Sequence, residues 1–144
     1  MTVPGDAWAI VQPPGWPRPQ GYAHGIVASG RLVFLAGMLG WNREGQFETD
    51  DFVGQVDRAL RNVVELLAAA GARADHLVRL TWYITNREEY LRSLPALGAV
   101  YREVIGRHYP AMSVVEVSAL VEPRAKVEIE ATAVIPTPEG GTQR

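Results

Sequence analysis

Two strand-like segments near the C-terminal end, Met112 to Ala119 and Lys126 to Ile135, constrain the fold most strongly. Both are rich in β-branched residues, which favour strands, and a turn at Glu122–Pro123 joins them. We interpret both as carrying apolar residues on both faces: Val114 with Val115 and Val117 in the first, and Val127 with Ile129, Ala131 and Ala133 in the second. A sheet face left bare by the chain's own helices must be buried by something else, so this pattern predicts self-association.

The clearest helix is predicted from Phe52 to Ala70. Thr49-Asp50-Asp51 precedes it with side chains that cap helix N-termini, and Gly71 is a natural C-terminal stop. Apolar residues recur at spacings of three and four and predict one buried face: Phe52, Val56, Ala59, Leu60, Val63, Leu67 and Ala70.

A second helix is predicted from about Asn86 to Ile105, interrupted at Pro95. Ser93 could restart it, because proline is tolerated in a first helical turn. The run Leu77 to Thr85 is rich in β-branched and aromatic residues and predicts a strand that follows the first helix, as in a β-α-β unit.

Near the N-terminus, Trp8 to Val11 predicts a short edge strand. Ile26 to Ala28 and Leu32 to Gly37, separated by Ser29–Gly30, predict a β-hairpin with a tight turn. The whole pattern is typical of an α+β fold: a mixed sheet of about six strands with two helices on one face. We expect a single domain over residues 1–144, with a proline-rich lead-in at 1–20 and a flexible tail at 136–144.

Composition excludes several functions. Fourteen Lys and Arg residues against 16 Asp and Glu give a net charge of -2, which offers no drive toward nucleic acid. The chain has no cysteine, and its three histidines lack ligand spacing, so we expect no disulfide, no metal site and no cofactor. Without a run of 18 apolar residues or a basic secretory leader, no membrane association is expected and the default location is cytoplasmic.

The run Pro110-Ala111-Met112-Ser113-Val114-Val115-Glu116-Val117, followed by Val127-Glu128-Ile129-Glu130-Ala131, resembles the C-terminal signature of the Rid family, the YjgF-like reactive-intermediate deaminases. Matching stretches occur in the same order elsewhere in the chain: Gly21 to Gly25, Leu32 to Met38, Gln55 to Gly71, Val100-Tyr101 and His108 to Ala111. The resemblance implies a chorismate-mutase-like protomer, assembled as a homotrimer with a small-molecule pocket in each of three clefts between subunits.

The chain departs from the family where imine-hydrolysing members carry their polar groups. The resemblance places serine, glutamine, asparagine, arginine and often cysteine at five positions that here read Ala36, Met38, Gly98, Met112 and Val114. The arginine position matters most, because a guanidinium grips a substrate carboxylate with two hydrogen bonds and methionine has no donor. We therefore expect poor turnover of 2-imino acids, and an uncharged, partly aromatic or aliphatic ligand, unless an arginine reaches in from elsewhere.

By the same resemblance, Glu128 would activate water while Tyr22 and the Gly37 backbone N–H orient a substrate. The full set of expected ligand-binding residues is Tyr22, His24, Ala36, Gly37, Met38, Trp82, Gly98, Met112 and Val114. Simpler roles compete: Trp82 could pack in the core, and Glu116, Glu128 or Glu130 could pair with Arg124 or another arginine.

We expect hydrolysis or tautomerisation of an enamine or imine, with a non-catalytic ligand-binding or regulatory trimer as the alternative. The mild acidity of the chain disfavours the endoribonuclease activity that is sometimes attached to this family.

Overall fold

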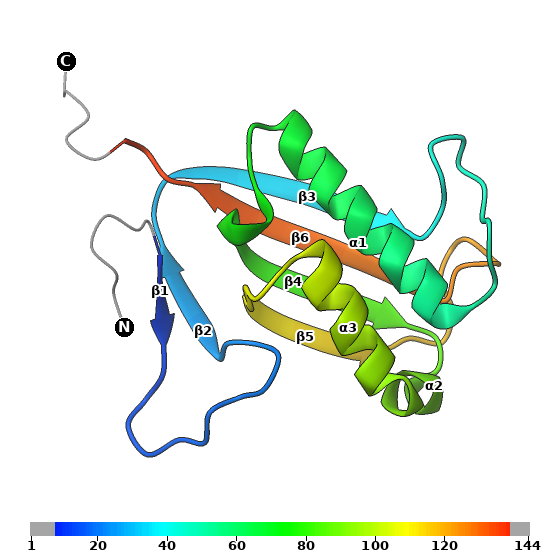
Figure 1. Ribbon diagram of the computed structural model, residues 1–144, viewed down its shortest axis with the longest axis horizontal. Helices are drawn as coiled ribbons and strands as arrows, with labels where there is room; N and C mark the ends of the chain where they lie inside the picture. The colour runs from blue at the N-terminus through cyan, green and yellow to red at the C-terminus, as the bar shows by residue number, and fades with distance from the viewer. Residues whose placement is uncertain (1–7, 139–144) are drawn as a thin grey trace.

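The computed structural model describes residues 8–138 and has a four-stranded mixed sheet with the order β3-β6-β4-β5 (Figure 1). Strand β6 pairs antiparallel with both of its neighbours, and β4 and β5 pair in parallel. The four strands are β3 (Arg31–Leu39), β4 (Leu77–Ile84), β5 (Ala111–Glu116) and β6 (Val127–Ile135). The α+β prediction is confirmed. Of the predicted lead-in and tail, residues 1–7 and 139–144 lie outside the described part of the chain.

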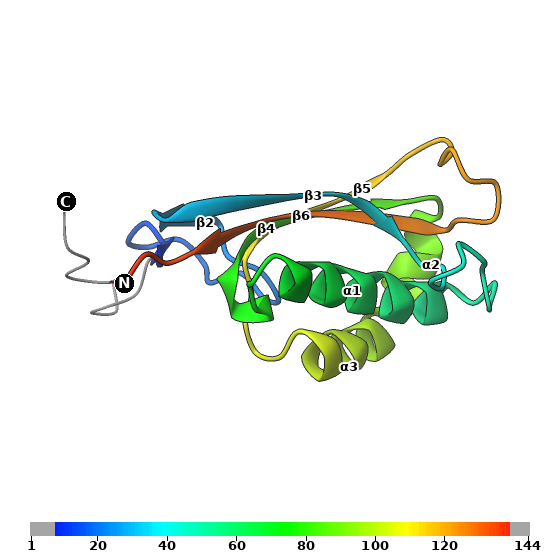
Figure 2. The same ribbon diagram turned by 90° about the horizontal axis from the view of Figure 1, so that it is seen from above.

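The helices connect the strands and lie on one side of the sheet, while its other face carries no helix (Figure 2). Helix α1 (Phe52–Ala69) and a short 3-10 helix, η1 (Ala74–His76), link β3 to β4. Helices α2 (Arg87–Arg92) and α3 (Leu94–Val104) link β4 to β5, which is the helical crossover that parallel neighbours require.

Helix α1 forms as its capping and periodicity predict. The Asp51 carboxylate accepts a hydrogen bond from the Gly54 N–H at 2.8 Å, and Gly71 ends the helix with φ +81°. The predicted apolar face is buried against β3 and β6, except that Ala70 is the exposed C-cap.

The second predicted helix is two helices, so the expectation of two helices in the chain is wrong. Asn86 caps α2 by accepting the Glu89 N–H at 2.9 Å. The break comes at Ser93, and Pro95 sits in the first turn of α3, where its missing N–H costs nothing. The helix therefore breaks two residues before the predicted interruption.

The predicted hairpin between β2 (Gly25–Ala28) and β3 is wrong. Strand β2 instead pairs with β1 (Trp8–Val11) in a separate two-stranded antiparallel sheet, while β3 pairs with β6. Gly30 allows this change of direction with φ +143°, at a point where it lies against the Ile135 carbonyl. The six strands therefore form one sheet of four and one of two.

The prediction that β6 is apolar on both faces is also wrong. Val127, Ile129, Ala131 and Ala133 alternate along the strand, so all four face the helices and are buried. Their intervening neighbours, Glu128, Glu130 and Thr132, lie on the face without helices. Exposed apolar side chains on that face come instead from β3 and β5: Leu32, Phe34 and Val115.

Candidate functional site

A pocket of about 700 Å³ lies between α3, β5 and the segment that precedes β2. We call it the aromatic pocket, because five of its lining residues are Tyr or Trp. Its sheet wall is Trp82, Met112 and Val114, its mouth is Gln20 to Tyr22, and the helical side consists of Tyr90, Leu94, Leu97, Gly98, Tyr101 and Arg102, with Tyr109 beside them.

Strand register explains why the sheet wall has this composition. Trp82 of β4 pairs with Val114 of β5, and Leu80 pairs with Met112, so these side chains share the helix-covered face. Tyr22 reaches the mouth because Ala23 bridges to Ala111 and donates its N–H to the Pro110 carbonyl at 3.0 Å. Ala23 and Ala111, 88 positions apart in the sequence, thereby become neighbours.

Tyr101 is a structural tyrosine of this pocket. It stacks on Tyr109 with ring centroids 5.4 Å apart and planes 13° apart, and its hydroxyl donates to the His108 carbonyl at 2.6 Å. Burial raises the pKa of Tyr101 well above its usual range, so this hydroxyl stays protonated at neutral pH.

Trp82 is both a core residue and a pocket residue. It is only 4% exposed and its ring meets Tyr90 edge-on, yet its indole Nε1 is buried without a hydrogen-bond partner. An unpaired buried donor costs free energy unless an acceptor reaches it. The described part of the chain thus leaves this buried N–H unsatisfied.

Glu128 lies on the opposite face of the sheet. It pairs across the strands with Tyr83, whose side chain also points away from the helices. Its carboxylate sits against Gly37, where a Cβ would overlap it, so only glycine allows this approach. Within residues 8–138 the Glu128 carboxylate accepts no hydrogen bond and forms no ion pair.

The neighbouring glutamates have partners. Glu130 accepts a hydrogen bond from the Tyr83 hydroxyl at 2.7 Å, and this hydrogen bond is the main reason that the pKa of Tyr83 is raised. Glu116 accepts the Arg87 N–H at 2.6 Å, at the start of α2. The alternative pairing of a strand glutamate with Arg124 is wrong, because Arg124 pairs with Asp50 at 2.8 Å.

The expected site residues therefore divide into separate groups. Five line the aromatic pocket: Tyr22, Trp82, Gly98, Met112 and Val114. Gly37 and Glu128 lie on the uncovered face, with Ala36 in the β3 bulge between Leu35 and Met38. Met38 pairs with Ile129 and packs against the core, and His24 lies outside the aromatic pocket, edge-on to Tyr22 and Trp16.

Sequence reasoning missed most of the helical side of the pocket, above all Arg102. One available signal was the spacing of Gly98 and Arg102, which puts them one turn apart on the same side of a helix. Tyr101 and Tyr109 were quoted for the resemblance but not assigned to the site. Among the described residues, no three His, Asp or Glu side chains are grouped as metal ligands, and no helix is long and apolar enough to cross a membrane.

Comparisons with known proteins agree with this architecture. Residues 17–135 match the family model described as Endoribonuclease L-PSP. A 2-iminobutanoate/2-iminopropanoate deaminase from Dermatophagoides farinae is 31% identical over 127 residues, which is 88% of this chain and 95% of that protein.

Solved structures match closely as well. YyfB from Yersinia pestis, a protein of unknown function of the conserved Rid protein family, superposes with a TM-score of 0.80 at 30% identity, covering 90% of this chain and 99% of its own. Escherichia coli TdcF with bound serine has a TM-score of 0.63 at 29% identity, covering 89% and 99%.

Proposed function

The chain belongs to the Rid family, and we propose that it binds a small organic molecule in a cleft completed between copies of itself. We further propose that it hydrolyses or tautomerises an enamine- or imine-type group of that molecule. One observation carries the proposal: the pocket and the unpaired Glu128 carboxylate lie on opposite faces of one sheet.

This separation favours an assembled site. Within one protomer, a ligand in the aromatic pocket has the sheet between itself and Glu128. A homotrimer packed through the uncovered faces would bring the Gly37–Glu128 pair of one subunit to the pocket side of the next. The exposed Leu32 and Phe34 on that face supply apolar surface for such a contact.

The chemistry fits a single carboxylate. Glu128 would take a proton from water while the water oxygen bonds to the imine carbon, and it would pass that proton to the imine nitrogen, which gives a neutral carbinolamine. Glu128 would then take the hydroxyl proton of the carbinolamine and return it to the nitrogen as the C–N bond breaks, which gives a carbonyl compound and an amine or ammonia. The Gly37 N–H and the Tyr22 ring would orient the substrate.

An imine-hydrolysis assay tests the proposal. Neutral aryl-alkyl imines and 2-iminopropionate would be generated in place by amine or amino-acid oxidases, and release of the carbonyl product measured. We expect the neutral imines to be hydrolysed and 2-iminopropionate to react weakly or undetectably, because Met112 offers its carboxylate no donor on the sheet wall and the methyl group of this substrate buries little apolar area.

Glu130→Gln is the matched control, since Glu130 lies on the same strand face but is held by Tyr83. Glu128→Gln should lower turnover by about 100-fold or more, and Glu130→Gln should retain it. Turnover that survives Glu128→Gln would refute the assignment of the base.

A non-catalytic ligand-binding trimer is the second candidate. It is favoured by the pocket lining, because the residues from 8–138 that form it include no Asp, Glu, His or Lys that could transfer a proton. Saturable ligand binding by calorimetry, with no turnover of any imine or enamine in the panel, would establish this function in place of the enzymatic one.

A further inference from the structure

We propose that Arg102 is the ligand-recognition cation of the aromatic pocket, and that the pocket takes an organic anion with an aromatic or branched apolar body. The proposal rests on the proposed function, since it names the ligand class of the same pocket. It assigns the anion to the wall formed by α3 instead of the sheet wall, where Met112 stands.

The charge of the pocket lining points to an anion. Among the described residues that line the pocket, Arg102 is the one charged side chain, and no carboxylate is present to neutralise it. The remaining polar groups include the hydroxyls of Tyr22 and Tyr90, both of which can donate hydrogen bonds. A carboxylate is the ligand group that such donors suit.

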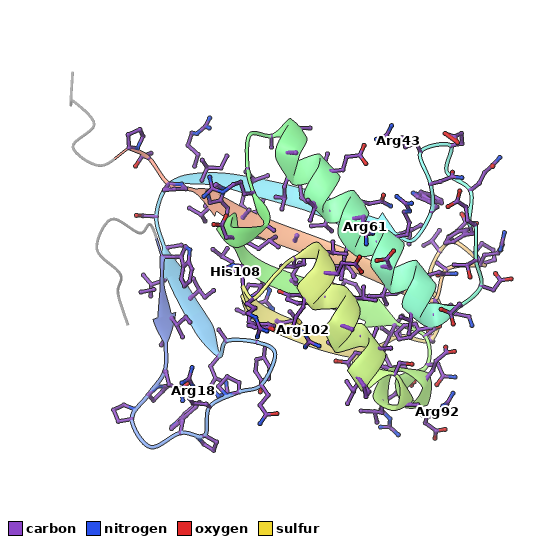
Figure 3. All side chains as sticks on the ribbon, viewed as in Figure 1. Arg18, Arg43, Arg61, Arg92, Arg102 and His108 are labelled. Carbon is purple, nitrogen blue, oxygen red and sulfur yellow. The ribbon has the colours of Figure 1, made fainter. Side chains whose placement is uncertain are left out.

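Arg102 has no structural partner that would explain its position. Its neighbour Glu103 pairs with Arg61 of α1 at 3.6 Å, and Arg61 is also held by Asp57 at 3.1 Å. Arg102 projects from a different side of α3, over β5 (Figure 3), and no ion pair within residues 8–138 involves it. The guanidinium is therefore available to a ligand.

Gly98 makes room for this guanidinium. A Cβ at position 98 would lie 3.2 Å from Arg102 Nη1, which is closer than most Cβ contacts. A larger side chain there would push the guanidinium away from its position. Gly98 and Arg102 lie one helical turn apart. Because position 98 carries no side chain, the Arg102 guanidinium can occupy space that a bulkier residue at position 98 would fill.

The apolar residues of the pocket determine which kind of ligand body fits beside the charged group. Trp82, Met112 and Val114 form an apolar sheet wall, with Leu97 and Tyr101 on the helical side. A small anion such as acetate would meet only Arg102, which is exposed and well hydrated. An anion with an apolar body gains both the charge contact and burial of apolar area.

Calorimetric titration with a matched ligand pair tests the assignment. The probes are 3-phenylpropionate and its neutral amide, with acetate as the anion that lacks a body. We expect the intact protein to bind 3-phenylpropionate about threefold to tenfold more tightly than the amide, and acetate weakest of the three. The preference for the acid should shrink in high salt, while amide binding should not weaken.

Variants then assign the preference to a residue. Arg102→Gln should bind acid and amide equally, and Arg102→Lys should keep part of the preference, because an ammonium retains the charge without the two-pronged geometry. Arg92→Gln is the matched control: Arg92 is the exposed last residue of α2, it does not line the aromatic pocket, and Figure 3 shows it at a different place from Arg102. It should leave both affinities unchanged.

The outcomes separate this assignment from the proposed function. If the intact protein binds the amide as tightly as the acid, or Arg102→Gln keeps the preference, the assignment of Arg102 fails while the small-molecule pocket stands. If neither phenyl probe binds, both fail.

Discussion

At the scale of single residues, the helix-covered and uncovered faces of the sheet carry different chemistry. Met112 makes the sheet wall of the aromatic pocket apolar, and the guanidinium of Arg102 supplies its charge from α3. Glu128 remains an unpaired carboxylate on the uncovered face, held beside Gly37. The two proposals therefore place ligand recognition and proton transfer on different surfaces of the protomer.

Met112→Arg should raise the affinity for small carboxylates such as propionate by only about threefold to tenfold. A new guanidinium adds a charge-assisted contact, but Ala36 and Gly98 still provide no polar side chains around it. Titration calorimetry would measure the change, with Met112→Leu as an apolar control. Propionate binding to the unmodified protein more tightly than neutral aromatics would contradict this account.

His76 should make stability depend on pH. Its Nδ1 accepts the Arg73 N–H at 3.0 Å, its Nε2 is buried without a partner, and burial is the main cause that lowers its pKa. At pH values between the ordinary histidine pKa of about 6.5 and the lower pKa of folded His76, this side chain binds a proton in the unfolded chain but not in the folded one. The free energy of unfolding should therefore decrease as pH falls from 7.5 to 5.5.

Urea denaturation at several pH values measures this effect. His76→Asn should flatten the dependence, because its side-chain oxygen can accept the Arg73 N–H and does not titrate. An unchanged slope in the variant would assign the dependence to other groups.

At the scale of elements, two glycines differ in the space around them: Gly98 has room for a side chain, and Gly40 is closely packed. In α3, Gly98→Ala should stabilise the protein by about 0.5–1 kcal/mol, because alanine restricts the unfolded chain and the nearest obstacle is the mobile end of Arg102. After β3, Gly40→Ala should destabilise it by about 1–3 kcal/mol, because a Cβ would lie 2.8 Å from Gln55 Cα in α1.

Chemical denaturation of the two variants gives the comparison directly. Both replace a glycine by the same residue, so opposite signs would show that local space decides the outcome. Destabilisation by Gly98→Ala would mean that Arg102 cannot shift as its exposed position implies.

At the scale of the whole molecule, the uncovered sheet face carries the assembly prediction. Phe34 is 72% exposed and Leu32 60% exposed, both on that face. Phe34→Glu should dissociate the expected homotrimer at micromolar concentration, as measured by light scattering, because burying an unpaired charge is costly. Leu66→Glu, on the outer side of α1, is the control that should leave the mass unchanged. A stable monomer of the unmodified chain would overturn the prediction.

The sequence by itself determined the features that depend on neighbouring residues. Asp51 and Gly71 mark the ends of α1, and Ser93 with Pro95 divides α2 from α3, because capping and helix interruption act within one or two turns. The β-branched and aromatic residues of Leu77 to Thr85 likewise predicted the strand at β4. The family resemblance, carried by contiguous motifs, was readable for the same reason.

Only the tertiary structure decided which distant segments meet. Alternating apolar residues identify a strand but not its partner, so the pairing of β2 with β1, and of β3 with β6, could not be predicted from them. The same reason hid where Arg102 and Glu128 lie relative to the pocket. Arg102 lines the pocket, which α3 and β5 border, and Glu128 lies across the sheet from it because it alternates on β6 with the buried Val127 and Ile129.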